Sequence, residues 1–90
     1  MDKERIINLL SNQQAFKILI SSKFYMDALT LAIGDFLNIR ELLTLFFIEG
    51  LSEKELSEYY NVSPVVIDDW LGKIFRITNA LINKNIIRFK

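Results

Sequence analysis

The scarcity of helix-breaking residues is the feature that most limits what this chain can fold into. Its 90 residues contain one proline, Pro64, and three glycines. Apolar residues recur three and four positions apart along most of the chain, which is the spacing of one face of an α-helix. We therefore expect an all-α fold, a small bundle of five or so helices. A strand is conceivable only in the last few residues.

The first 37 residues predict helices whose number stays open. Asp2 can cap a first short helix, and Ser11 or Asn12 can cap a second. The pair Ser21-Ser22 indicates a break or a bend. After this pair an apolar stripe continues at helical spacing, formed by Phe24, Ala28, Leu31, Ala32 and Phe36. Whether the first 37 residues form one long helix, two or more therefore stays open.

The residues that follow contain clearer helix ends. Asn38 is a favourable N-cap, and Gly50 supplies the left-handed residue that ends a helix at low cost. Ser52 is followed three positions later by Glu55, which is the pattern of a capping box. A short helix is therefore expected to begin at Ser52 and to run to about Tyr60.

A second helix is expected after a tight turn. Asn61 tolerates a positive φ angle better than most residues and can make this turn. Ser63 and Pro64 supply an N-cap and a first-turn proline. The last helix is therefore expected to run from Pro64 to about Asn83.

The order of these elements is that of a helix-turn-helix. The segment from Glu49 to Ile74 resembles this unit in LuxR-type regulators and in region four of bacterial sigma factors, and the likeness extends over residues 39–83. The resemblance implies that Ser57 is the small residue at the closest helix contact and that Asn61 replaces a turn glycine. It implies that six apolar positions clamp the two helices: Leu51, Leu56, Tyr60, Val62, Ile67 and Leu71.

The resemblance also implies that the second helix of the unit enters the major groove of duplex DNA. Contacts in the groove are then expected from Ser63, Val65, Val66 and Lys73. Phosphate contacts are expected from Ser52, Lys54 and Arg76 and, if the tail folds back, from Lys84, Arg88 and Lys90. Asp68 and Asp69 depart from the family pattern. Phosphates repel their carboxylates, although aspartate can accept a hydrogen bond from cytosine N4.

Charge and missing residue types exclude several classes of function. Eleven basic and eleven acidic residues cancel, and the isoelectric point of about 6.2 is low for a DNA-binding domain. The chain has no cysteine and no histidine, which excludes disulfides, thiolate metal sites and histidine catalysis. Because no serine has an evident activating base either, we expect no catalytic residues, no metal, no cofactor and no enzyme activity.

The chain is expected to be one soluble, cytoplasmic domain. Its longest apolar stretches are far shorter than the roughly 20 residues that cross a bilayer, and its N-terminus lacks the form of a signal peptide. The domain divides into N-terminal helices (residues 1–37), the helix-turn-helix unit (38–83) and a basic tail (84–90). The small size suggests an origin in a phage, a plasmid or a compact operon.

Two functions stay open. The first is a helix-turn-helix transcription regulator that binds duplex DNA as a homodimer, with an interface on the last helix formed by Trp70, Ile74, Ile77 and Leu81. The second is a protein-binding adaptor or inhibitor, for instance of the transcription machinery, whose contact face is Val65, Asp68, Asp69 and Trp70. A sigma-like fragment that touches both polymerase and promoter is compatible with either.

Overall fold

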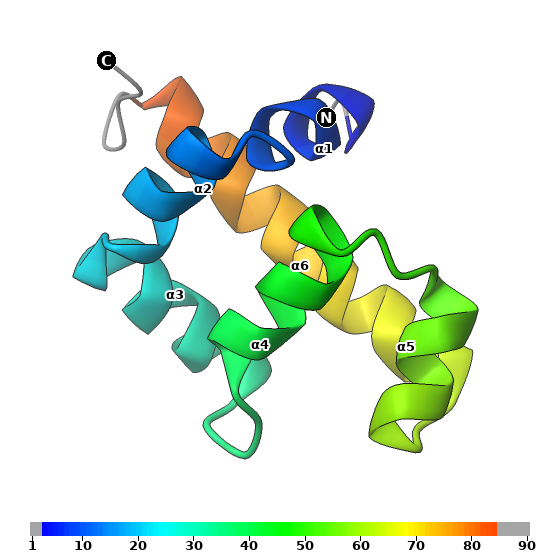
Figure 1. The fold of residues 1–90 in the computed structure, drawn as a ribbon. Coiled ribbons are helices and arrows are strands. Elements are labelled where there is room, and N and C mark those ends of the chain that lie inside the picture. The colour runs from blue at the N-terminus through cyan, green and yellow to red at the C-terminus, as the bar shows by residue number, and fades with distance from the viewer. Residues whose placement is uncertain (1–2, 85–90) are drawn as a thin grey trace.

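Helices make up most of the part of the chain that the structure describes. This computed structural model describes residues 3–84 (Figure 1). The elements in chain order are α1 (Lys3–Leu10), α2 (Gln13–Ile20), α3 (Lys23–Ile33), α4 (Ile39–Leu43), the π-helical turn η1 (Thr44–Ile48), α5 (Glu53–Tyr60) and α6 (Pro64–Asn83). No strand occurs within residues 3–84, and the expected all-α class is confirmed. The predicted cap Asp2 and the conceivable C-terminal strand lie outside the described residues.

Short polar side chains separate the N-terminal helices. The Asn12 side chain accepts hydrogen bonds from the backbone nitrogens of Gln14 and Ala15, at 2.9 and 3.1 Å, at the start of α2. The Ser22 hydroxyl accepts from the backbone nitrogen of Tyr25 at 3.2 Å at the start of α3. These caps satisfy amides that have no partner within the helix. Of the two alternatives left open at Ser21-Ser22, a break or a bend, the structure has the break, and α2 and α3 are two helices.

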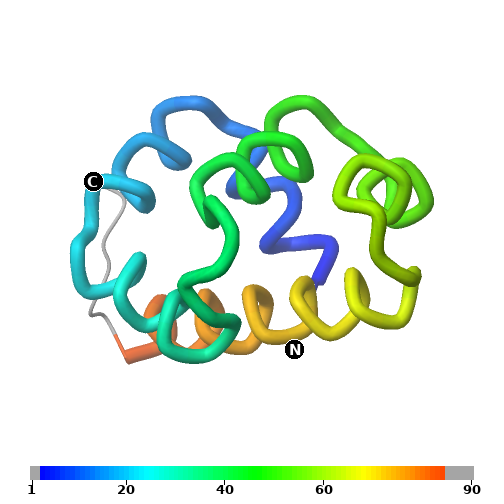
Figure 2. Tube along the Cα trace, turned by 90° about the horizontal axis from the view of Figure 1, so that it is seen from below, coloured from blue at the N-terminus to red at the C-terminus, as the bar shows by residue number. Residues whose placement is uncertain are grey.

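The long helix α6 holds the two halves of the molecule together. It packs against α3 and α1 from the N-terminal region and against α5 from the helix-turn-helix unit. Figure 2 shows α6 along one edge of the fold, with the other helices covering one of its sides. That side is buried and consists of Ile67, Trp70, Leu71, Ile74, Phe75, Thr78 and Leu81. A single hydrophobic core therefore runs along α6.

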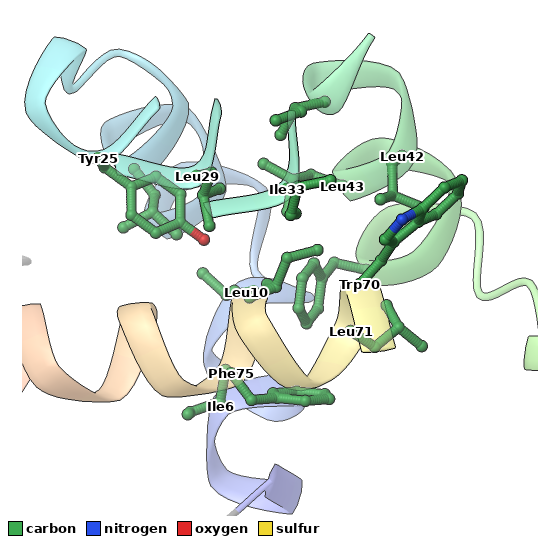
Figure 3. Close-up of a cluster of buried hydrophobic side chains, with 14 of the residues drawn as sticks. Ile6, Leu10, Tyr25, Leu29, Ile33, Leu42, Leu43, Trp70, Leu71 and Phe75 are labelled. Carbon is green, nitrogen blue, oxygen red and sulfur yellow. The ribbon is translucent and has the colours of Figure 1, made fainter. Parts of the chain in front are cut away.

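The apolar stripe that follows Ser22 in the sequence is not the side of α3 that is buried. The buried residues of α3 are Tyr25, Leu29 and Ile33 (Figure 3). Three members of the predicted stripe are instead exposed: Phe24, Leu31 and Phe36. Because α3 is apolar on both sides, both sets of residues have helical spacing, and the spacing alone cannot choose between them.

A hydrogen bond between helices accompanies the burial of Tyr25. The Tyr25 and Thr78 hydroxyl oxygens lie 2.8 Å apart, and Thr78 Oγ1 donates to the Ile74 carbonyl at 2.7 Å. Burial raises the pKa of Tyr25, and the hydrogen bond to Thr78 offsets part of this shift. Within residues 3–84 no buried polar side-chain atom lacks a partner. The hydroxyl of Tyr25 therefore enters the core without an unsatisfied group.

The helix expected from Asn38 is α-helical only in its first half. Asn38 accepts a hydrogen bond from the Glu41 backbone nitrogen at 3.1 Å, so the predicted cap is confirmed. Gly50 has a φ of 76°, the left-handed conformation predicted for the end of the helix. Between them the backbone widens into η1, where the Glu49 nitrogen bonds the Thr44 carbonyl five residues earlier at 2.9 Å. The sequence pattern did not indicate this π-helical turn.

Edge-on aromatic packing joins η1 to α6. The rings of Phe46 and Phe47 each lie 6.1 Å from the ring of Phe75, with interplanar angles of 77° and 88°. Lys3 of α1 places its ammonium 5.6 Å from the same Phe75 ring. Aromatic pairs with this geometry contribute stabilisation beyond their buried area. The wider turn therefore brings two consecutive phenylalanines against one side chain of the central helix.

Candidate nucleic-acid interface

The turn between α5 and α6 has the geometry that the sequence predicts. Asn61 adopts φ 55° and ψ 47°, a left-handed conformation that ends α5. The backbone nitrogen of Val62 donates to the Ser57 carbonyl at 3.1 Å, and the Ser57 hydroxyl donates to the Val62 carbonyl. The small residue expected at the closest helix contact thus also fastens the turn. The chain turns sharply at Asn61 before α6 begins.

Both predicted helix starts are present, but they differ in their polar contacts. The Ser52 backbone nitrogen donates to Glu55 Oε1 at 2.9 Å, and the Glu55 nitrogen donates to the Ser52 hydroxyl at 3.1 Å, which completes the capping box. The hydrogen bond from the Ser52 backbone lowers the pKa of Glu55, because it favours the charged carboxylate. Ser63 has an extended N-cap backbone before Pro64, but its side chain makes no capping hydrogen bond.

The residues expected to clamp the two helices lie between them or beside the core. Leu56, Ile67 and Leu71 are buried. Leu51, Tyr60 and Val62 are half-buried and pack against the core. Because the caps, the turn and these contacts agree, residues 53–83 form a helix, a three-residue turn and a helix with its own apolar seam.

A contact that the sequence analysis missed fastens α4 to α5. The hydroxyls of Tyr59 and Tyr60 each donate to a carboxylate oxygen of Glu41 at 3.2 Å. The Tyr60 ring also packs edge-on against Trp70, with 5.6 Å between centroids. The neighbouring carboxylate raises the pKa of Tyr59, and burial together with this carboxylate raises that of Tyr60. No periodic pattern links residues 18 and 19 positions apart, so only the fold reveals this site.

The start of α6 is presented to solvent on one side. Val65 is 77% exposed, and Pro64, Asp68 and Asp69 are exposed beside it. Arg76 is exposed and follows Val65 by eleven positions, about three helical turns, which places both on one side of α6. The expected groove contacts Ser63 and Val65 and the expected phosphate contacts Ser52, Lys54, Arg76 and Lys84 are therefore accessible. Arg88 and Lys90 lie outside the described residues.

Two of the expected groove residues are placed less favourably for DNA contact. Val66 is half-buried and packs against the core, because it lies on the inward side of α6. The Lys73 ammonium lies 3.0 Å from the Asp69 carboxylate, four residues earlier on the same helix. Val66 is therefore less accessible than Val65, and Lys73 is in an ion pair that phosphate contact would have to replace.

Charge is divided unevenly along the unit. Residues 49–69 contain six acidic residues and one basic residue, whereas residues 70–90 contain five basic residues and no acidic one. The acidic part includes Glu53, Glu55 and Glu58 of α5 and both aspartates of α6, and all five are exposed. The exposed carboxylates therefore lie near the turn, and the exposed cation Arg76 lies further along α6.

The homodimer interface predicted on α6 is not accessible. Trp70, Ile74 and Leu81 are buried within one chain, and Ile77 is half-buried against the core. The reason is that α1, α3 and α5 together cover the apolar side of α6. Trp70 is for the same reason unavailable as a contact residue for a protein partner. The apolar residues of α6 that were expected to form an interface are instead part of the chain's own core.

The described residues also show no arrangement for a metal ion or a membrane span. Within residues 3–84 no group of three or more histidine, cysteine, aspartate or glutamate side chains is placed to hold a metal. In the same part of the chain no helix combines the length and hydrophobicity needed to cross a bilayer.

Comparisons of the chain with protein-family models, with curated proteins and with solved structures give no match. The geometry alone therefore defines the class. It is a small all-α protein in which a short capped helix, a left-handed asparagine turn and a long helix follow one another.

Proposed function

We propose that this chain is a helix-turn-helix transcription regulator that binds duplex DNA through the start of α6. The observation that carries the proposal is the exposed start of α6 directly after the sharp turn at Asn61. A helix presented in this way fits the major groove and leads with its N-terminal residues. Val65 can contact a thymine methyl, and an aspartate on this face can accept from cytosine N4.

The expected phosphate contacts lie at the beginning of α5 and further along α6. Ser52 and Lys54 lie at the beginning of α5, and Arg76 lies three turns along α6 on the side of Val65. Cations of this kind provide affinity without sequence preference, and they make binding weaken as salt rises. Asp68 and Asp69 oppose this attraction. We therefore expect weak binding to a duplex of arbitrary sequence.

The negative charge near the turn favours a second candidate, a protein-binding adaptor or inhibitor built on the same scaffold. In this case Val65, Asp68 and Asp69 form the accessible contact face. An exposed apolar side chain flanked by carboxylates suits a partner surface that is apolar and basic. The two candidates differ in the effect that removing an aspartate has on binding to DNA.

The test compares Asp68→Lys with Glu4→Lys, which makes the same change of charge on α1. Both positions are exposed, so both variants are expected to fold. On a mixed-sequence duplex at low salt, Asp68→Lys should bind roughly fivefold more tightly than the parent, about 1 kcal/mol, because two charge units change near phosphates. The slope of log affinity against log salt should steepen by about one.

Fluorescence anisotropy of a labelled duplex measures both quantities. Glu4→Lys should change affinity much less than Asp68→Lys. An equal gain in DNA affinity for the two variants would show that the position of the added charge is irrelevant. This result would contradict DNA binding through the start of α6. An absence of binding by the parent and by both variants at low salt would overturn the DNA proposal and leave the protein-binding candidate.

A further inference from the structure

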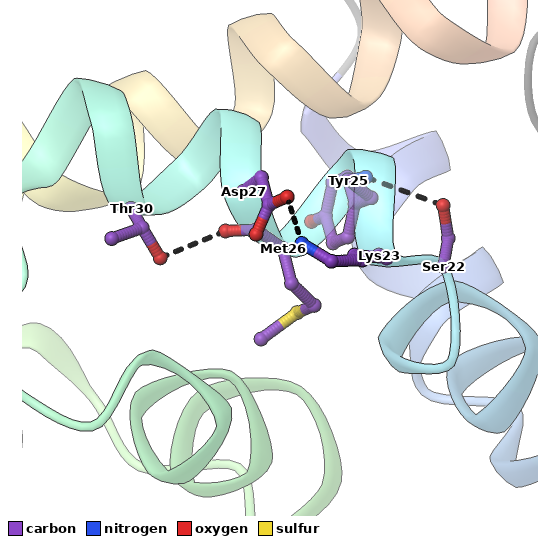
Figure 4. A network of polar contacts seen from close by, with 6 residues as sticks. All are labelled: Ser22, Lys23, Tyr25, Met26, Asp27 and Thr30. Atoms are coloured by element: carbon purple, nitrogen blue, oxygen red, sulfur yellow. Dashed lines mark hydrogen bonds and ion pairs between the residues drawn. The ribbon is translucent and has the colours of Figure 1, made fainter.

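A single carboxylate joins α4 to the two tyrosines that end α5. The hydroxyls of Tyr59 and Tyr60 donate to different oxygens of Glu41, each at 3.2 Å. We call this pair of hydrogen bonds the Glu41 tether. The ion pair between Lys23 and Asp27, at 2.6 Å, lies by contrast within the single helix α3 (Figure 4). The Glu41 tether therefore restrains one helix relative to another, which a contact within one helix does not.

Helix α5 has few other restraints against rotation. Among the described elements it packs extensively only against α6, and Leu56 is its one buried residue. The Leu51 backbone nitrogen donates to the Leu45 carbonyl of η1 at 3.0 Å and holds the chain before α5, while the turn at Asn61 holds its other end. A helix held at its two ends can still rotate about its own axis. The Glu41 tether lies to one side of that axis and opposes this rotation.

The two tyrosines approach Glu41 from different directions. Consecutive residues of an α-helix point about 100° apart, so rotation of α5 in either direction lengthens one of the two hydrogen bonds. The rings of Tyr59 and Tyr60 also pack edge-on against each other, with centroids 4.9 Å apart, and the Tyr60 ring lies 5.6 Å from that of Trp70. Rotation of α5 would therefore also disturb its aromatic contact with α6.

The backbone of Glu41 is itself held in place. Its nitrogen donates to the Asn38 side chain at 3.1 Å in the first turn of α4, and α4 packs against α3. Glu41 has the same position after its N-cap as Glu55 has in α5, but its two oxygens bind α5. The rotation of α5 is thus set relative to the N-terminal helices.

We propose that Glu41 is a positioning residue for DNA binding, which fixes the rotation of α5 and so the direction in which Lys54 meets a phosphate. This inference rests on the proposed function. Lys54 is exposed and lies about 170° around α5 from the middle of the tyrosine pair, so it points away from the tether. The first helix of a helix-turn-helix crosses the DNA backbone. Any rotation of α5 therefore turns Lys54 by the same angle relative to the phosphates.

Two substitutions at position 41 separate the tether from its charge. Glu41→Gln and Glu41→Ala both remove one negative charge. The glutamine amide can still bind both hydroxyls, because its oxygen accepts from one tyrosine and its nitrogen donates to the other. On a mixed-sequence duplex at low salt, Glu41→Ala should bind about threefold more weakly than Glu41→Gln. The slope of log affinity against log salt should be smaller by about one, because the Lys54 contact is lost.

Asp27→Ala is the matched control for the loss of charge. It removes one carboxylate and the contact with Lys23 within α3, and it leaves the Glu41 tether intact. Because removal of a negative charge favours DNA, this variant should bind no more weakly than the parent. Equal affinities of Glu41→Gln and Glu41→Ala for a duplex that the parent binds would overturn the role of Glu41 in DNA binding.

The emission of Trp70 tests the tether without DNA, because the Tyr60 ring packs against this side chain. Glu41→Ala should shift the emission, and Glu41→Gln should leave it close to that of the parent. The double variant Tyr59→Phe, Tyr60→Phe keeps the charge of Glu41 but removes both donors, so it should reproduce the shift. Adding Glu41→Ala to this double variant should produce no further change. Circular dichroism checks that every variant keeps its helices.

These measurements distinguish a failure of the tether from a failure of the proposed function. An unchanged Trp70 emission in Glu41→Ala would overturn the tether, whatever the affinity for DNA. If the parent binds no duplex, the proposed function and the role of Glu41 in DNA binding both fail. The emission of Trp70 alone then decides whether Glu41 fixes α5.

Discussion

Two single residues show how differently local and distant contacts can be recognised from a sequence. Asn61 takes the left-handed conformation that its position before Ser63-Pro64 predicts, because few other residues tolerate positive φ. Tyr25 gives no such signal. Its partner Thr78 is 53 positions away, and the pair exists only because α3 and α6 lie side by side.

The buried Tyr25 is expected to make the protein less stable at alkaline pH. Its folded-state pKa is raised, so the folded state holds the proton more tightly than the unfolded state does. The contribution of Tyr25 to the free energy of unfolding is therefore fully present below the ordinary tyrosine pKa of about 10, and it is lost as the pH rises beyond that value. Tyr25→Phe should lose about 1 kcal/mol at neutral pH, because one hydrogen bond disappears while Thr78 keeps its bond to Ile74.

Urea unfolding at pH 7 and at pH 11 measures both effects. The parent should lose more stability between the two pH values than Tyr25→Phe does. Tyr60 also has a raised pKa, so the variant should retain part of the pH dependence. An equal loss in the parent and in the variant would show that folding does not raise the pKa of Tyr25.

At the scale of elements, the helix ends follow from local chemistry and the buried sides do not. Asn12, Ser22, Asn38 and Ser52 all cap the helices that follow them, since each has a short polar side chain that reaches an unpaired amide. The buried side of α3 and the π-helical turn η1 depend instead on the side chains that neighbouring helices bring to them. Phe46 and Phe47 meet at Phe75, which is 28 positions from the nearer of them.

The two serines that begin α5 and α6 provide a matched test of the capping interaction. Ser52→Ala should cost about 1 kcal/mol, because it removes the acceptor for the Glu55 amide and half of the capping box. Ser63→Ala should cost less, since the Ser63 side chain makes no capping hydrogen bond. Chemical denaturation of both variants measures the difference. Equal losses, or a greater loss at Ser63, would contradict the polar contacts at the two helix starts.

At the scale of the whole molecule, α6 makes one cooperative unit out of two helical regions. Its 20 residues extend about 30 Å, most of the 36 Å length of the fold. Ile67 and Leu71 pack in the helix-turn-helix unit, whereas Thr78 reaches α3. Neither region can bury its apolar residues without this helix.

Unfolding should therefore be a single transition. Fluorescence of Trp70, the one tryptophan of the chain, and the far-ultraviolet circular dichroism should give coincident denaturation curves. Ile74→Ala at the centre of α6 should cost about 2 to 5 kcal/mol and shift both curves together. Val65→Ala, at an exposed position of the same helix, should change stability by about 0.5 kcal/mol or less. Two separate transitions would show that the N-terminal helices and the helix-turn-helix unit fold independently.

The sequence by itself determined the all-α class, the capping box and the turn at Asn61, and it left a break or a bend open at Ser21-Ser22, where the structure has a break. These features depend on residues within five positions of one another, and local hydrogen bonds and backbone preferences settle them. Only the tertiary structure decided which side of α3 is buried, that Trp70, Ile74 and Leu81 belong to the core, and that Glu41 binds two tyrosines. The physical reason is that a helix apolar on more than one side can pack in several ways. Which of its sides is covered depends on contacts between residues far apart in the chain.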